Sequence, residues 1–251
     1  MAGHSKWANI KHRKSRQDAK RGKEFTKVIR EITVAAKESG EDSPRLRQAV
    51  EKALSVNMTR VTIDKAIKRA LGGEEGLDYQ EVIYEGYGPG GSAIYLEVLT
   101  DNKNRSVAEI RHALSRRGGN LGAAGCAAHL FAKLGVIEVK GVTDEDQLLL
   151  DALDAGASEM EAAGESDADA DGDTEEAGSS YFLQSAPGDL QNLRDTLEKN
   201  NYEIGNAEVT MLAHTNIELS EDDLVKIKNL YDDLDDLDDV QNIYCNVSLD
   251  D

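Results

Sequence analysis

The chain is 251 residues long, which allows one to three domains with a sizeable buried core. Its formal net charge is −19, and hydrophobic residues make up 39% of it, within the range of soluble globular proteins. No stretch approaches the ~18 consecutive apolar residues of a membrane span, and the basic N-terminus lacks the apolar segment of a secretory signal. Because Cys126 and Cys245 form no C-x-x-C pair, we expect neither a disulfide framework nor a zinc site, and we expect a cytoplasmic location.

Positive and negative charges are segregated along the chain. Residues 1–72 hold 18 lysines and arginines against 8 acidic residues, a net charge of +10, whereas residues 73–251 hold 11 against 40, a net charge of −29. Residues 1–22 carry many bases and no sustained apolar stripe, so we interpret them as a basic arm on an acidic body. The arm and the residue that follows it offer Lys6, Trp7, Lys11, Arg13, Lys14, Arg16, Lys20, Arg21 and Lys23 as nucleic-acid contacts.

The chemistry of the arm favours a nucleic-acid partner over a tail that only keeps the protein in solution. Each phosphate that a lysine or arginine neutralises releases counterions, which makes such binding strong and dependent on salt. Trp7 adds a face on which a base can stack, an interaction worth ~1–3 kcal/mol. Phosphate contacts do not distinguish duplex DNA from ribosomal RNA, so both stay open as partners.

Three short amphipathic helices follow the arm and predict a helical domain over residues 23–76. The first has apolar residues from Phe25 to Ala36 at spacings of three and four and ends near Gly40. Ser43 and Pro44 form an N-cap and first-turn pair for the second helix. We expect Thr62 to cap the third, which ends at Gly72.

The pattern then changes to alternating strands and helices. Strands are predicted at 79–85, 92–99, 136–139, 181–185, 207–212 and 240–247, and helices at about 144–155, 189–199 and 221–234. A further helix is expected to begin at a capping box of Ser106 and Glu109 and to end at Gly118, and Ser220 is expected to cap the last helix. This alternation is typical of two small α+β domains of the split β-α-β, ferredoxin-like kind.

An acidic segment interrupts the second of these domains. Residues 159–178 hold nine acidic residues, no base and no aromatic residue, which predicts a disordered loop. Within it, DADADGD begins like a calcium loop, but the twelfth position is Gly178 where a bidentate glutamate is needed. We therefore expect no metal site there.

Two further motifs carry candidate contacts. The GYGPGG turn, formed by Gly86, Tyr87, Gly88, Pro89, Gly90 and Gly91, matches a dinucleotide fingerprint in its letters. A strand follows it where the fingerprint needs a helix, so we interpret it as a hairpin turn whose exposed tip is a functional loop. A second basic cluster, which includes Arg105, Arg116 and Arg117, is equally consistent with helix capping and with polyanion contact.

The sequence offers no credible set of nucleophile, base and orienting acid. It contains no G-x-S-x-G and no P-loop, and its five histidines have no metal-ligand spacing. We therefore expect no enzyme activity, no cofactor and no small-molecule substrate.

Several long strings, MAGHSKWANIKHRK, QDAKRGKEFTKVIREITVAAK, YEGYGPGG, LTDNKNRS, RRGGNLG and LDDVQNIY, resemble the YebC/PmpR family. That family also contains the mitochondrial translational activator of cytochrome c oxidase. The resemblance implies a helical N-terminal domain and two α+β domains, the third inserted in the second. It places these domains at 23–76, at 77–133 with 213–251, and at 134–212. It also adds His12 to the contacts of the arm.

Two activities are implied by the resemblance. The first, which we expect here, is DNA binding as a transcriptional regulator. The alternative is a translation factor whose arm binds ribosomal RNA and whose glycine-rich turn reaches a functional centre of the ribosome, relieving stalls at proline runs. The chain departs from the family pattern in its long acidic insert, in His129 where an aromatic residue is expected, and in the absence of a proline after Met58.

Overall fold

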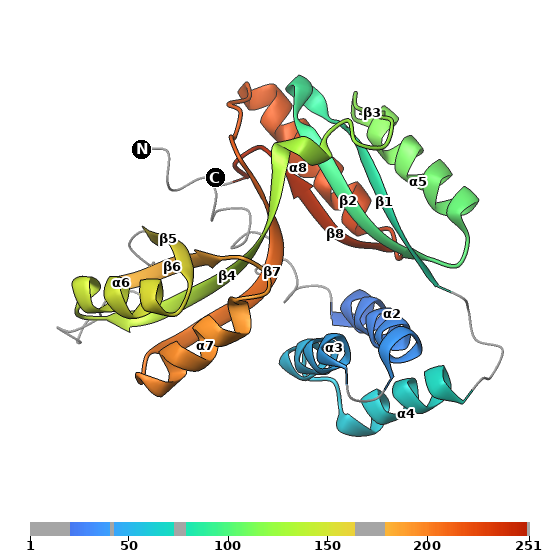
Figure 1. The fold of residues 1–251 in the computed structure, drawn as a ribbon. Coiled ribbons are helices and arrows are strands. Elements are labelled where there is room, and N and C mark those ends of the chain that lie inside the picture. The colour runs from blue at the N-terminus through green and yellow to red at the C-terminus, as the bar shows by residue number, and fades with distance from the viewer. Residues whose placement is uncertain (1–20, 41–42, 73–78, 164–178, 250–251) are drawn as a thin grey trace, which may run out of the picture. The chain divides into compact units, whose positions relative to one another are not determined.

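The computed structural model describes residues 21–40, 43–72, 79–163 and 179–249. Two compact units divide them: Leu130–Asn216 form one, and the described part of Lys11–His129 forms the other together with Ile217–Leu249. The mixed α+β class predicted from the sequence is confirmed, with helices and two antiparallel sheets (Figure 1). None of the helices in these ranges combines the length and the apolar character that a membrane crossing requires.

A bundle of three helices begins the described chain. They are α2 (Arg21–Ser39), α3 (Pro44–Ser55) and α4 (Arg60–Leu71). Their apolar stripes meet in one core, in which Val28, Ile32 and Ala53 are fully buried. The predicted cap of α3 is confirmed, because the Ser43 hydroxyl accepts a hydrogen bond from the Leu46 amide at 3.1 Å.

The predicted cap of α4 was wrong by three residues. Thr59, not Thr62, is the N-cap: its backbone is extended, and its hydroxyl accepts a hydrogen bond from the Thr62 amide. A capping side chain reaches the amide of the second or third helical residue, so a threonine at the third position marks a helix that has already begun. The helix is therefore one turn longer at its N-terminus than its apolar residues alone indicate.

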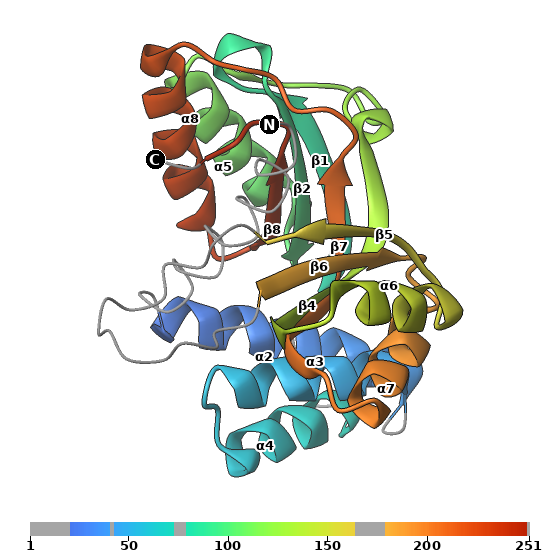
Figure 2. The ribbon, with the colours of Figure 1, turned by 90° about the vertical axis from the view of Figure 1, so that its left-hand side faces the viewer.

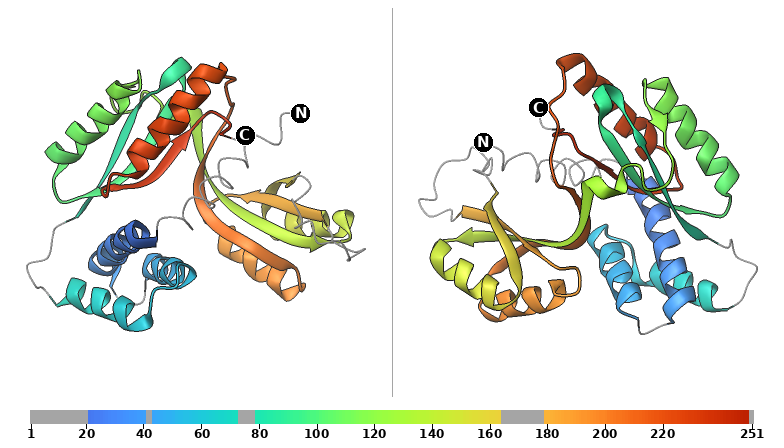
Figure 3. Two further views of the ribbon diagram at one scale, coloured as in Figure 1. Left: turned by 180° about the vertical axis from the view of Figure 1, so that it is seen from behind. Right: turned by 45° about the horizontal axis from the view of Figure 1, so that its top comes forward.

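The first sheet belongs to the same unit as the bundle. Its strands are β1 (Gln80–Tyr87), β2 (Ala93–Thr100), β3 (Asn120–Leu121) and β8 (Val240–Cys245), in the order β3-β1-β2-β8. The helices α5 (Lys103–Arg116) and α8 (Glu221–Asp235) lie on one face of this sheet (Figure 3). Between them and the strands, Leu96, Ile110 and Leu230 are buried. Because α5 joins β2 to β3 with β1 between them, the predicted split β-α-β arrangement is present.

The start of α5 also differs from the prediction. Asn102 is the N-cap, and its side-chain oxygen accepts a hydrogen bond from the Arg105 amide at 3.1 Å. Ser106, which the sequence indicated as the cap, lies inside the helix and is buried. Its hydroxyl donates instead to Asp239, more than a hundred residues further along the chain. The Ser220 cap of α8 is confirmed, with Asp223 as the amide donor.

The second unit is a four-stranded sheet with two helices on one face (Figure 2). Its strands are β4 (Phe131–Val142), β5 (Ala157–Ala162), β6 (Ser179–Ser185) and β7 (Glu203–Ala213), in the order β5-β6-β4-β7, and its helices are α6 (Glu145–Asp154) and α7 (Leu190–Lys199). Neighbouring strands are antiparallel, as the ferredoxin-like prediction requires. Leu148, Leu183 and Leu193 are fully buried between the helices and the sheet.

The acidic segment predicted as a loop over 159–178 begins inside a strand. Residues 159–162 belong to β5, which pairs with β6 through Met160 and Leu183. An edge strand can take its backbone hydrogen bonds from a neighbour, so pairing overrides the low strand propensity of glutamate and alanine. Ala163 follows the strand, and its amide donates to the backbone oxygen of Ser180. The rest of the predicted loop, residues 164–178, lies outside the described residues, together with the calcium-like string.

Candidate nucleic-acid interface

Most of the arm residues predicted to contact nucleic acid lie outside the described residues. These are Lys6, Trp7, Lys11, His12, Arg13, Lys14, Arg16 and Lys20. Arg21 is the first residue of α2, and its side chain is likewise outside the description. Of the predicted arm contacts, the structure therefore describes the side chain of Lys23, together with the bases that follow it on α2.

The bases of α2 contact an acidic run at the end of α8. Lys23 Nζ lies 3.0 Å from Asp236 Oδ1, and Lys27 Nζ lies 2.7 Å from Asp235 Oδ1. One turn further, Arg30 Nη1 donates to Asp239 Oδ1 at 2.7 Å and to a backbone oxygen of the same run at 2.6 Å. Lys23, predicted as a nucleic-acid contact, is thus an intramolecular partner of aspartate in this structure.

Asp239 is the most highly connected acid of this run. Its carboxylate accepts hydrogen bonds from Thr100 Oγ1 at 3.0 Å, from Ser106 Oγ at 2.7 Å and from Arg105 Nη2 at 2.8 Å, all to Oδ2. Only 4% of the Asp239 side chain is exposed. Burial raises the pKa of this carboxyl, but the hydrogen bonds from Arg105, Ser106, Thr100 and Arg30 outweigh it, so the pKa lies below its ordinary value.

Of the three predicted contacts on α5 and its C-cap, two form ion pairs with aspartates. Arg105 contacts Asp239 and, at 2.7 Å, Asp101; these hydrogen bonds raise the pKa of its guanidinium. Arg117 binds Asp233 through Nε at 2.6 Å and Nη2 at 3.1 Å, which raises its pKa in the same way. These bidentate contacts favour the capping and packing role that the sequence left open.

The third predicted contact, Arg116, is different. It is exposed, and within the described ranges it has no acidic side chain at ion-pair distance. Arg111, about one and a half turns earlier on the same helix, is also exposed and has no acidic side chain at ion-pair distance among the described residues. These two arginines leave α5 with a positive surface that a polyanion can reach.

The same criterion identifies bases that the sequence prediction missed. On α4, Arg60, Lys65 and Lys68 are exposed and have no acidic partner in the described part of the chain. The signal was present in the string RVTIDKAIKRAL, which has four bases and one acid. The prediction followed the higher density of bases in the arm and overlooked a helix whose apolar stripe leaves its bases on the opposite side.

Less of the glycine-rich turn is exposed than the sequence predicted, because part of it belongs to strand β1 and part of it is buried. Gly86 and Tyr87 end β1, and Pro89–Gly91 form one turn of 3₁₀-helix before β2. The Tyr87 hydroxyl donates to the backbone oxygen of Cys126 at 2.8 Å, and Gly88 and Pro89 are buried. Only Gly90 and Gly91 are exposed, so the accessible tip is two residues of backbone.

Close backbone approach explains two of the glycines. A Cβ on Gly86 would overlap the backbone oxygen of Asn120 in the neighbouring strand β3. A Cβ on Gly119 would lie 2.5 Å from the backbone oxygen of Tyr87. Since real Cβ atoms do not approach so closely, these glycines let β1 pair with the segment after α5.

A buried carboxylate organises the same segment. Glu85 accepts hydrogen bonds from the amides of Gly125, Ala127 and Ala128, each at 2.7 Å. Burial raises the pKa of this carboxyl, but the three amides outweigh it, so its pKa is lowered and it holds the loop as an anion. No group of three histidine, cysteine or acidic side chains in the described ranges is placed to hold a metal ion.

Known proteins match this chain along nearly its whole length. A family model described as the TACO1/YebC protein N-terminal domain matches residues 5–73, and one described as the TACO1/YebC second and third domain matches residues 79–247. A "Probable transcriptional regulatory protein" of Tolumonas auensis is 49% identical, over 100% of this chain and 97% of that protein. Another with this name, from Aeromonas salmonicida, is 51% identical over 100% and 98%.

A solved structure is also similar. It is a conserved hypothetical protein from Aquifex aeolicus, with a TM-score of 0.75 and 38% sequence identity. The match covers 92% of this chain and 91% of that chain.

Proposed function

Because the chain belongs to the TACO1/YebC family, we propose that it is a nucleic-acid-binding regulator of gene expression that binds DNA in the cytoplasm. The names of its relatives, probable transcriptional regulatory proteins, support regulation of transcription. The observation that carries the proposal for this chain is its segregated charge. A protein with a net charge of −19 places a net charge of +10 in its first 72 residues.

The sorting of bases into paired and unpaired sets supports the same function. Lys27, Arg105 and Arg117 form ion pairs with aspartates, whereas Arg111 and Arg116 on the surface of α5 form no ion pair with an acid among the described residues. Exposed bases without an ion pair contribute little to the stability of the fold, but they contribute strongly to affinity for phosphate groups. We propose that the arm supplies most of the affinity.

The alternative function, a translation factor that acts on the ribosome, uses the same bases with ribosomal RNA as the partner. This function also requires the tip of the glycine-rich turn to reach into a functional centre of the ribosome. In this chain the exposed part of the glycine-rich turn is Gly90 and Gly91, while Tyr87 is tied to Cys126. The turn therefore offers backbone groups but no reaching side chain, which favours DNA as the first candidate. Under either function, we propose no catalytic role for this protein.

A salt titration of the purified full chain tests the proposal. Binding to a labelled DNA duplex and to an RNA duplex of equal length would be measured by fluorescence anisotropy. If ~6 phosphates are contacted, log affinity for DNA should fall against log salt with a slope near −5. Affinity that is absent at low salt, or that does not change with salt, would exclude the proposed mode of binding.

A further inference from the structure

The helix α4 carries an excess of positive charge on an otherwise acidic chain. Its twelve residues, Arg60–Leu71, hold Arg60, Lys65, Lys68 and Arg69 against a single acid, Asp64. By contrast, the first residues of α8 are Glu221, Asp222 and Asp223, and the whole chain has a net charge of −19. A basic helix on so acidic a protein calls for a physical reason.

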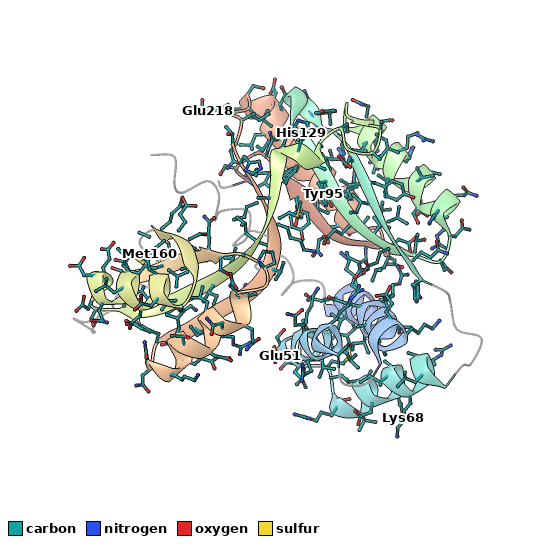
Figure 4. All side chains as sticks on the ribbon, in the orientation of Figure 1. Glu51, Lys68, Tyr95, His129, Met160 and Glu218 are labelled. Carbon is teal, nitrogen blue, oxygen red and sulfur yellow. The ribbon has the colours of Figure 1, made fainter. Side chains whose placement is uncertain are left out.

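Packing turns the bases of α4 outward. Ile63 and Ala70 are buried against α2 and α3, so the opposite side of the helix faces away from the bundle. Lys65 and Lys68 are on that side, and Arg60 is exposed at the N-terminal end of the helix. In Figure 4 the Lys68 side chain extends away from the helical bundle. Val61, between them on the helix surface, is 63% exposed, so nothing in the described chain covers this face.

The bases of this face differ from other bases of the bundle in their lack of an acidic partner within the described ranges. Lys52 on α3 contacts Glu31 of α2 at 2.8 Å, and Lys27 on α2 contacts Asp235 at 2.7 Å. For Arg60, Lys65 and Lys68 the described chain provides no such acid. Their charges are therefore available to an external anion.

Helix stability does not account for them. Lys68 is in the last turn of α4, where the helix macrodipole favours a positive charge. Arg60, however, is the first residue of the helix, where the macrodipole opposes a positive charge, and α4 has no acid in its first turn. Lys65 lies in the middle of the helix, where the effect of the macrodipole has faded.

We propose that the exposed bases of α4, Lys65 and Lys68 on its outer side and Arg60 at its N-terminal end, form a second contact surface for the phosphate backbone of nucleic acid, separate from the arm. This inference rests on the proposed function and adds a site to it. At a rise of 1.5 Å per residue, the α carbons of Arg60 and Lys68 are about 12 Å apart along the helix axis. A duplex presents roughly three to four phosphates per strand over that length, enough for each base to find one.

The face is suited to positioning rather than to reading sequence. Phosphate contacts fix the register of a protein on a duplex but carry no sequence information. α4 belongs to the same bundle as α2, which follows the arm directly, so one bundle joins the two contact surfaces. Two linked contacts bind more tightly than either alone, because the second forms at a high effective concentration.

The test uses the full chain with the substitutions Arg60→Gln, Lys65→Gln and Lys68→Gln together. The matched control changes three exposed lysines of the other unit, Lys133→Gln, Lys140→Gln and Lys199→Gln, and alters the net charge by the same amount. The probes are a DNA duplex and an RNA duplex of about 30 base pairs, long enough for ~6 phosphate contacts. A third variant, Lys65→Arg with Lys68→Arg, keeps the charge.

We expect the α4 variant to bind the favoured duplex at least about tenfold more weakly and to reduce the salt slope by about two to three. The control in the other unit and the charge-keeping variant should stay within about twofold of the unmodified chain. The melting temperature of every variant should be unchanged, since the altered side chains make no packing contact in the core.

Failure of this inference and failure of the proposed function are distinguishable. If the unmodified chain binds and the α4 variant matches it in affinity and slope, the α4 surface is not a nucleic-acid contact, although the proposed function stands. If the α4 variant and the control weaken binding equally, net charge alone is responsible and the inference is overturned. If the unmodified chain binds neither duplex, the proposed function itself fails.

Discussion

Deletion of residues 1–20 is expected to weaken binding to duplex DNA by about a hundredfold or more at ~0.1 M salt. The deleted segment contains six of the bases assigned to the arm: Lys6, Lys11, Arg13, Lys14, Arg16 and Lys20. The slope of log affinity against log salt becomes shallower by about 0.9 for every phosphate that is no longer neutralised. The affinity of the truncated chain should therefore depend less on salt. Affinity would be measured by anisotropy on the duplex used for the full chain.

The deletion should leave the fold intact, since α2 begins at Arg21 and the bundle core begins with Phe25 and Val28. A matched control keeps all twenty residues in a shuffled order. If phosphate contact is the main interaction, the shuffled arm retains most of the affinity. The truncated chain should keep weak binding through α4. A truncated chain that binds within about twofold of the full one would refute the role of the arm.

Replacement of Asp239 by alanine is expected to destabilise the chain by about 3 kcal/mol, because it leaves buried donors without their acceptor. Asp239 accepts from Thr100, Ser106, Arg105 and Arg30, and so joins the helical bundle, α5 and the sheet. Urea unfolding would measure the loss as a lower midpoint at an unchanged slope.

The matched control is Asp236→Ala, which removes an acid of the same run. Its side chain is 55% exposed and contacts the half-exposed Lys23, so the loss should be below about 1 kcal/mol. Equal effects of the two substitutions would contradict the central role assigned to Asp239.

The effect of Asp239 should also depend on pH. Its pKa is lowered in the folded chain, so the folded state binds this proton less readily than the unfolded state. The stabilisation is therefore present above the unfolded pKa of ~3.9 and is lost as the pH falls through the lower folded value. The difference in stability between the unmodified chain and Asp239→Ala should shrink below about pH 4.

The elements that the sequence predicted well are those whose signals are local. The apolar stripe of α2 and the cap of α3 at Ser43 depend on residues within one or two helical turns. The predicted start of α5 was wrong because the Ser106 hydroxyl binds Asp239 instead of capping the helix. No local sequence pattern indicates a partner 133 residues away. The short strand β3 was missed for a related reason: two residues become a strand only by pairing with Gly86 and Tyr87.

The same limit applies to the candidate interface. Composition identified the bases of the arm, but it could not tell which bases elsewhere are already neutralised. Arg105 and Arg117 pair with Asp239 and Asp233, which follow them by more than a hundred residues. Lys65 and Lys68 are unpaired in the described chain because α4 packs with its other side toward the bundle. The three-dimensional arrangement therefore moves the predicted interface away from two arginines and toward a helix that the sequence prediction left out.

Binding of DNA by this protein is tested most directly by crosslinking the protein to nucleic acid in cells and sequencing the bound DNA and RNA. We expect discrete DNA sites that are enriched for the full chain and absent when residues 1–20 are deleted. Enrichment confined to ribosomal RNA would replace the transcriptional function by the ribosomal one. Recovery of neither DNA nor RNA above the level of the truncated chain would contradict nucleic-acid binding through the arm.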